Sequence, residues 1–165
     1  HVGFLSATGV SGVLMAVSTL FASVTTLTAG RLSDRVPDRT WVTVPAFGCL
    51  AVGFVSLALV PTLAGALAGV AAVGVGVEGV SIPLMAYLGD ISPSDDVGKL
   101  GGVYTVFGDL GSTVGPLVAL PFAVRYGYRV EYLACVAFVV ATAFLVVALV
   151  GDDRVVDAAA VPADD

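Results

Sequence analysis

The chain has 165 residues, of which 58% are hydrophobic and only 12% are charged, whereas about 25% of residues are charged in ordinary globular domains. Together with a mean hydropathy of +1.01, this composition excludes a soluble cofactor enzyme. The net charge is −6 and no basic patch indicates nucleic-acid binding. The length allows about five or six spanning helices of ~20 residues, so we expect an all-α integral membrane protein.

The first predicted span covers residues 9–30, within a stretch from residue 2 to residue 29 that carries no charged side chain. Ser11, Ser18 and Thr25 recur every seven residues and therefore share one helical face. This face could line an aqueous cavity. Alternatively, the hydroxyl groups bond their own i−4 carbonyls or a neighbouring helix, and the sequence leaves both interpretations open.

A charged segment follows, in which residues 30–39 read GRLSDRVPDR. The apolar runs on both sides predict that it is a water-exposed turn between two spanning helices. The second span covers residues 41–60 and opens with Trp41, a residue type favoured at the membrane interface.

Pro61 and Thr62 predict a tight turn before the third span, residues 63–88. Its small residues form a stripe at helical spacing that favours close helix packing: Gly65, Gly69, Ala72, Gly76 and Gly79. Residues 74–79 also match G-x-G-x-x-G, but they lie midway along an apolar segment that is too long for a strand. We therefore reject dinucleotide binding, which requires a strand before the pattern and a helix opening after it.

A second polar turn, residues 89–99, leads into the fourth span, residues 99–122. Small and polar residues form a stripe along this span, with Asp109 beside it: Gly101, Thr105, Gly108, Ser112 and Gly115. The fifth span covers residues 129–150. Residues 151–165 form an acidic tail with five of the thirteen acids of the chain, which predicts a disordered, solvated end.

The positive-inside rule gives the predicted orientation. Five basic residues fall on one side of a five-span arrangement, and Arg125 and Arg129 fall on the other. The charged turn at residues 31–40 and the C-terminal tail are therefore expected to be cytoplasmic. Cys49 and Cys135 lie within apolar runs and are interpreted as core residues, and a lone terminal His1 gives no support for a metal site. A chain that starts at His1 rather than Met suggests a piece of a longer protein.

Two acids lie deep within apolar spans. Glu78 is eleven residues before Gly89, and Asp109 is ten residues after Lys99, which places both about 15–16 Å along their helices from the same turn and near the membrane midplane. Intramembrane acids often mark proton or ion pathways, so either acid, or both, is a candidate for proton uptake. For Asp109, structural hydrogen bonding is an equally good explanation. Glu78 lies about 200° around the helix from Gly76, which favours a position facing a cavity.

Several segments together resemble the major facilitator superfamily. Residues 30–39 resemble its signature loop, roughly G-x-x-x-D-R-x-G-R-R, with Pro37 and Asp38 as departures. The third span resembles the tenth span of that family through Gly76, Gly79 and Pro83. The fourth resembles the eleventh, and its Gly111 to Pro116 segment is similar to the antiporter motif without the final Gly-Gly.

The resemblance implies that residues 1–150 are spans eight to twelve, a partial C-terminal bundle of a twelve-span secondary transporter in the plasma membrane. Such a protein moves a small solute by alternating access; proton coupling and efflux are favoured, and no cofactor is implied. The missing N-terminal half, lipid and the solute would be its partners. The resemblance also implies a conformational latch at Gly30, Asp34, Arg35 and Arg39. The residues themselves give the other candidate positions: proton coupling or a cavity at Glu78, Thr105, Asp109 and Ser112, and helix packing at Gly65, Gly69, Gly76, Gly111, Gly115 and Pro116.

Two other classes compete with this interpretation. A non-transporting, scaffold-like bundle that pairs with another chain would have the same hydropathy. An intramembrane aspartyl protease would need two acids in catalytic sequence contexts, and one Glu with one Asp fits that requirement poorly. The expected function is therefore transport rather than catalysis.

Overall fold

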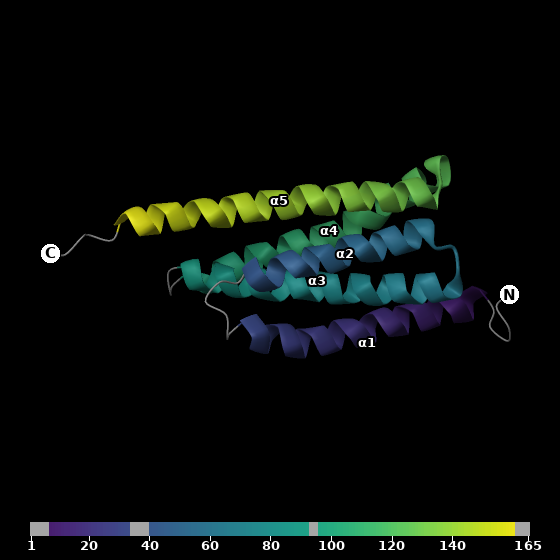
Figure 1. The fold of residues 1–165 in the computed structure, drawn as a ribbon, viewed down its shortest axis with the longest axis horizontal. Coiled ribbons are helices and arrows are strands. Elements are labelled where there is room, and N and C mark those ends of the chain that lie inside the picture. The colour runs from purple at the N-terminus through teal and green to yellow at the C-terminus, as the bar shows by residue number, and fades with distance from the viewer. Residues whose placement is uncertain (1–6, 34–39, 93–95, 161–165) are drawn as a thin grey trace.

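Helices make up nearly all of the chain that the computed structural model describes, namely residues 7–33, 40–92 and 96–160. In chain order they are α1 (Ala7–Ser33), α2 (Thr40–Leu59), α3 (Leu63–Ile91), α4 (Val97–Tyr126) and α5 (Tyr128–Ala160). All five are long and apolar enough to cross a membrane, and they lie lengthwise along one axis of the molecule (Figure 1). The predicted all-α membrane fold with about five spans is confirmed.

The helix ends differ most from the predicted spans at the C-terminus. The fifth span was predicted to end at residue 150, whereas α5 continues to Ala160; the disorder expected for residues 151–165 stays a prediction. The physical reason is local propensity. No proline interrupts the segment before Pro162, and it ends in three alanines, the residue type with the highest helix propensity.

Glycines allow α2 and α3 to pack closely against each other. A Cβ atom built on Gly76 would lie 2.6 Å from the Cβ of Leu50, and one built on Gly53 would lie 2.9 Å from the carbonyl oxygen of Gly69. Only residues without a side chain allow two helix backbones to approach so closely. Pro83 of α3 is fully buried, and Phe47 of α2 is 6% exposed, so the core of the described bundle lies along this pair.

A three-residue connection from Val60 to Thr62 joins these two helices. The backbone N–H of Gly65 donates to the Oγ1 atom of Thr62 at 3.0 Å, which makes Thr62 the N-cap of α3. The hydroxyl of Ser56 donates to the carbonyl oxygen of Gly65 at 3.0 Å. The turn predicted at Pro61 and Thr62 is thus held by side chains from both helices.

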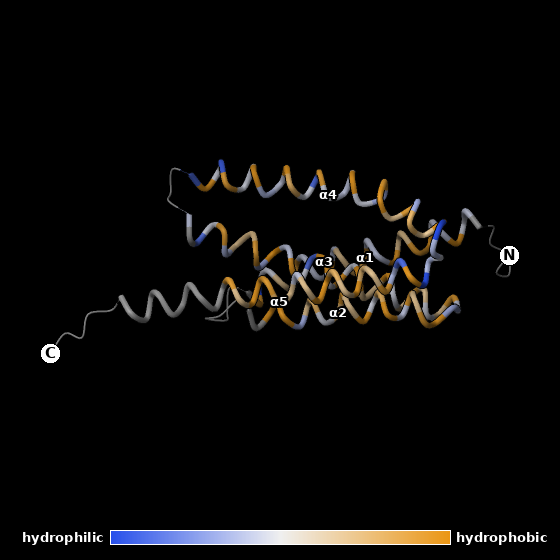
Figure 2. Tube along the Cα trace, turned by 90° about the horizontal axis from the view of Figure 1, so that it is seen from above, coloured by the Kyte–Doolittle hydropathy of each residue, from blue (hydrophilic) through white to orange (hydrophobic). Residues whose placement is uncertain are grey.

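The fourth helix is the least packed of the five. Figure 2 shows α4 apart from the other helices along much of its length, and Ala123 is its buried residue. One residue, Gly127, connects it to α5; this glycine has a φ of 89° and a ψ of 148°. On the other side of the bundle, α5 packs on α2, where the rings of Phe54 and Tyr132 stack with centroids 6.4 Å apart.

Large apolar side chains cover the outside of the described bundle. Phe144 is 78% exposed and Met15 is 76% exposed. Contiguous apolar surface of this extent is typical of membrane or protein contact, and helices satisfy their backbone hydrogen bonds internally, as a lipid environment requires.

Candidate functional site

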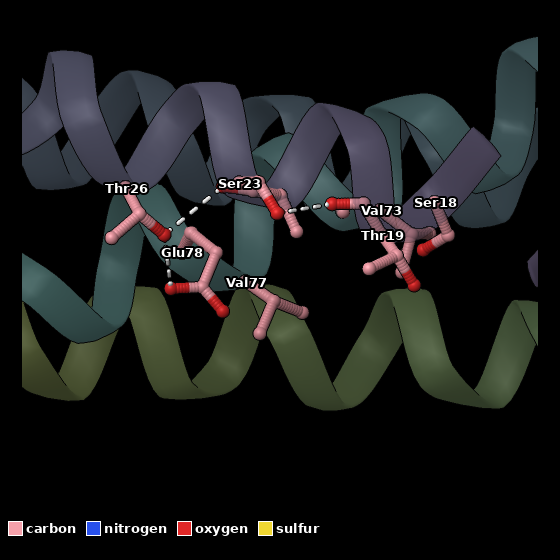
Figure 3. Close-up of a pocket in the computed structure, with 9 residues that line it drawn as sticks. Ser18, Thr19, Ser23, Thr26, Val73, Val77 and Glu78 are labelled. Atoms are coloured by element: carbon pink, nitrogen blue, oxygen red, sulfur yellow. Dashed lines mark hydrogen bonds between the residues drawn. The ribbon is translucent and has the colours of Figure 1, made fainter. Parts of the chain in front are cut away.

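The side chain of Glu78 points from the middle of α3 toward α1. Its Oε2 atom accepts a hydrogen bond from the Oγ1 hydroxyl of Thr26 at 3.1 Å, as Figure 3 shows. The two residues are 52 positions apart in the sequence. Glu78 and the α3 glycines that pack on α2 face different neighbours. Gly76 contacts α2, whereas Glu78 contacts α1.

A pocket of about 400 Å³ surrounds this pair between α1 and α3. This volume lies within the usual range for small-molecule sites, about 300–1,000 Å³. Hydroxyl groups of α1 form one part of the lining and apolar groups of both helices form another. The lining residues are Ser18, Thr19, Ala22, Ser23, Thr26, Val73, Gly74, Val77 and Glu78.

Two of the α1 hydroxyls in this pocket donate their protons to the helix itself. Thr19 donates to the carbonyl oxygen of Met15 at 2.9 Å, and Ser23 donates to that of Thr19 at 2.9 Å. A hydroxyl group has one proton and two acceptor lone pairs. Because the proton is used within the helix, the oxygen atoms offer acceptor capacity to the pocket. The two sequence interpretations concerned the face of Ser11, Ser18 and Thr25, of which Ser18 lines this pocket and Thr25 donates to the carbonyl oxygen of Phe21 at 2.8 Å.

Thr26 has two possible acceptors for its single proton. The carbonyl oxygen of Ala22 and the Oε2 atom of Glu78 are each 3.1 Å from its Oγ1 atom, and a hydroxyl donates one proton. When Glu78 is ionised, Thr26 can donate to it. When Glu78 is protonated, Thr26 can donate to Ala22 and accept from the carboxyl group, so this hydroxyl is compatible with both states.

The backbones of α1 and α3 come into contact at one end of the pocket. A Cβ atom built on Gly74 would lie 2.5 Å from the carbonyl oxygen of Ser18. A larger residue at position 74 would therefore force the two helices apart. Gly74 belongs to the G-x-G-x-x-G match, which lies within α3, and it acts in helix packing.

Asp109, the second candidate acid, lies on α4 and does not line this pocket. Its residue is exposed on α4, and within the described part of the chain its carboxylate has no hydrogen-bond partner. Its backbone carbonyl accepts instead, from the hydroxyls of Ser112 at 2.9 Å and Thr113 at 2.8 Å. Thr105 likewise donates to the backbone carbonyl of Gly101 at 3.0 Å. The pocket that contains Glu78 is therefore not lined by Thr105, Asp109 or Ser112.

The predicted latch is described only in part. Gly30 lies in the last turns of α1, and a Cβ atom built on it would have no other atom within 4 Å among the described residues. Asp34, Arg35 and Arg39 lie outside the described residues. Their role in a latch stays a prediction.

The predicted packing residues fall into two groups. Built Cβ atoms on Gly65 and Gly69 would lie 2.5 Å from Val60 and 2.7 Å from Leu57, and Gly76 abuts Leu50 as described above. On α4, Gly111 and Gly115 face open space within the described part of the chain, and Pro116 is exposed. The packing role of these three α4 residues stays a prediction.

The sequence prediction did not single out Thr26, Thr19 and Ser23 as neighbours of Glu78. It selected the seven-residue series Ser11, Ser18 and Thr25, of which Ser18 lines the pocket. The signal that could have identified this face is the four-residue spacing of Ser18, Ala22 and Thr26, because small residues at this spacing favour close packing in membranes.

The fold and the pocket together define a multi-pass membrane protein with a carboxylate-bearing polar site inside its spanning region. The family model described as Major Facilitator Superfamily matches residues 4–165, and the chain therefore belongs to this superfamily of membrane transporters, whose members are not enzymes. Comparison with curated proteins and with solved structures gave no match.

Proposed function

We propose that this chain is the C-terminal part of a proton-coupled secondary transporter that exports a small solute by alternating access. The observation that carries the proposal is the hydrogen bond between Thr26 and Glu78 inside a pocket of about 400 Å³. An acid within a spanning helix is costly unless it is partnered, and such acids often mark proton pathways. The pocket provides this acid with a hydroxyl partner that suits both of its protonation states.

The arrangement of the whole transporter is part of the proposal. An N-terminal half would face this bundle across the transport pathway, and the two halves would rock to open the site to each side in turn. The basic residues support a plasma-membrane orientation in which residues 31–40 and the C-terminal segment are cytoplasmic. The loop containing Asp34 and Arg35 would hold one conformation of the two halves.

Proton flux in proteoliposomes tests the role of Glu78. A pH gradient is imposed on vesicles that contain the complete transporter, including its N-terminal half, and a trapped pH-sensitive dye, and proton movement is followed over time. We expect Glu78→Gln to abolish coupled flux because the amide cannot take up a proton. Full flux in this variant would contradict the proposal.

The chain offers a matched control, since Glu131 is its other glutamate. Glu131 lies on α5 and accepts a weak hydrogen bond from the thiol of Cys135 at 3.5 Å. Glu131→Gln makes the same chemical change outside the pocket and should retain flux. Asp109→Asn, measured in parallel, decides whether the acid on α4 also takes part in coupling.

A further inference from the structure

We infer that the pocket between α1 and α3 binds a small organic cation that carries N–H donors, such as a protonated amine, on the carboxylate of Glu78. This inference rests on the proposed function, because it assigns a solute class to the same site. Three observations carry it: the charge of the lining, the direction of its hydroxyl protons, and the mixture of polar and apolar groups.

The lining favours positive charge. Glu78 is the one charged residue among the described residues that line the pocket. A carboxylate in an apolar environment requires a partner, and no cationic side chain of the lining supplies one. An anionic solute would meet uncompensated negative charge, whereas a cation would form a charge-assisted hydrogen bond.

The hydroxyl groups favour a ligand that donates hydrogen bonds. Thr19 and Ser23 direct their protons to carbonyl oxygens of α1, so toward the pocket they act as acceptors. An ammonium group has N–H donors and no acceptor. It therefore matches a site made of one carboxylate and several hydroxyl oxygens.

The apolar part of the lining favours an organic cation over a bare metal ion. Ala22, Val73 and Val77 contribute hydrocarbon to the pocket, which can contact a carbon skeleton but cannot coordinate a metal. The volume of about 400 Å³ also exceeds what a single ion fills. Small-molecule sites commonly combine such an apolar lining with a few polar groups.

The cation and the proton compete for the same carboxylate, that of Glu78, so only one of them can occupy it at a time. When Glu78 is protonated before binding, its carboxyl group releases the proton to water, the resulting carboxylate binds the ammonium group, and one proton leaves for each cation bound. When Glu78 is already ionised, the cation binds the carboxylate and no proton is released.

Isothermal titration calorimetry of the protein in lipid nanodiscs tests this inference with matched probes. The probes are phenethylammonium, its neutral analogue 2-phenylethanol, the anion phenylacetate, and sodium chloride. We expect phenethylammonium to bind and the other three to bind at least about tenfold more weakly, in line with the larger free energy of charged hydrogen bonds. Titration in buffers of different ionisation enthalpy counts the protons released.

The variants make the result specific. Glu78→Gln should weaken phenethylammonium binding about 10- to 100-fold, and Glu131→Gln should leave it within about twofold. Equal binding of 2-phenylethanol, preferential binding of sodium, or unchanged affinity in Glu78→Gln would overturn the inference.

Infrared difference spectroscopy separates this inference from the proposed function. A carboxyl band that titrates with pH and is absent from Glu78→Gln reports proton uptake at Glu78 without any solute. If this band and the coupled flux are present but phenethylammonium does not bind selectively, the solute class is wrong and the proposed function stands. If the band and the flux are both absent, the proposed function itself fails.

Discussion

The hydroxyl of Thr26 on α1 lies 3.1 Å from the Oε2 atom of Glu78 on α3, and equally far from the carbonyl oxygen of Ala22 in its own helix. One proton is thus placed between an intrahelical acceptor and an intramembrane carboxylate. The Thr26 hydroxyl therefore joins the carboxylate of Glu78 to the contact between two spanning helices.

Thr26→Val removes this hydroxyl and keeps the side-chain shape. We expect the infrared carboxyl band of Glu78 to shift in frequency, because the group loses a hydrogen-bond partner, and phenethylammonium affinity to change about 3- to 10-fold. Thr28→Val is the matched control. Thr28 donates to the backbone carbonyls of Val24 and Thr25, so its removal should leave the band in place. Identical spectra for the two variants would contradict the role of Thr26.

Gly76→Ala tests the packing of α2 against α3. The new methyl group would lie 2.6 Å from the Cβ and 2.7 Å from the backbone nitrogen of Leu50, so we expect the free energy of unfolding to fall by about 1–3 kcal/mol. Unfolding in mixed detergent micelles measures it. Gly102→Ala is the control: its methyl group meets no described atom within 4 Å, and alanine favours the helix by roughly 0.5–1 kcal/mol. Equal stability of the two variants would exclude close packing at Gly76.

Thr62→Ala tests the start of α3. The substitution removes the acceptor for the N–H of Gly65, and loss of such a cap costs about 0.5–2 kcal/mol. The same unfolding measurement should place Thr62→Ser close to the native protein, because serine keeps the hydroxyl. If serine destabilised as much as alanine, the cap would not explain the effect.

Gly127→Ala tests the connection between α4 and α5. A φ of 89° is a conformation that residues with a side chain rarely adopt, at a cost of about 1–3 kcal/mol. A Cβ atom here has no described atom within 4 Å, so any loss of stability would come from the backbone alone. Gly127→Asn should be no better, because a ψ of 148° lies outside the left-handed helical region that asparagine tolerates. Native stability in both variants would show that the connection adopts another conformation.

The spans themselves could be predicted from the sequence because hydrophobic length in a membrane is set by bilayer thickness. The turn at Pro61 and Thr62 and the glycine stripe facing α2 followed from local chemistry in the same way. The extension of α5 over residues 151–160 could not be predicted from composition. The acidic charge of this segment favours a disordered tail, whereas its helix propensity favours a helix.

The contact between Thr26 and Glu78 could not be predicted from the sequence, for a different reason. The rotation of a spanning helix is set by its neighbours, and α1 is apolar or hydroxyl-bearing on every side before Arg31 in its last turn. A seven-residue series therefore selected Thr25, one residue away from the group that contacts Glu78. The separation of Asp109 from the pocket has a similar origin, because equal depth in the membrane does not place two helices side by side.

The glycine contacts between α2 and α3 also determine what can move. Where backbone meets backbone, no side chain can change its rotamer to absorb sliding, so these two helices would shift together as a rigid block. Glu78 belongs to that block. Thr26 belongs to α1, which meets the block backbone to backbone at Ser18 and Gly74, so α1 can tilt about that contact but cannot slide past it. Tilting of α1 that lengthens the distance between Thr26 and Glu78 by less than about 1 Å breaks a hydrogen bond of ordinary length, so this bond would be sensitive to small movements of α1 against the block.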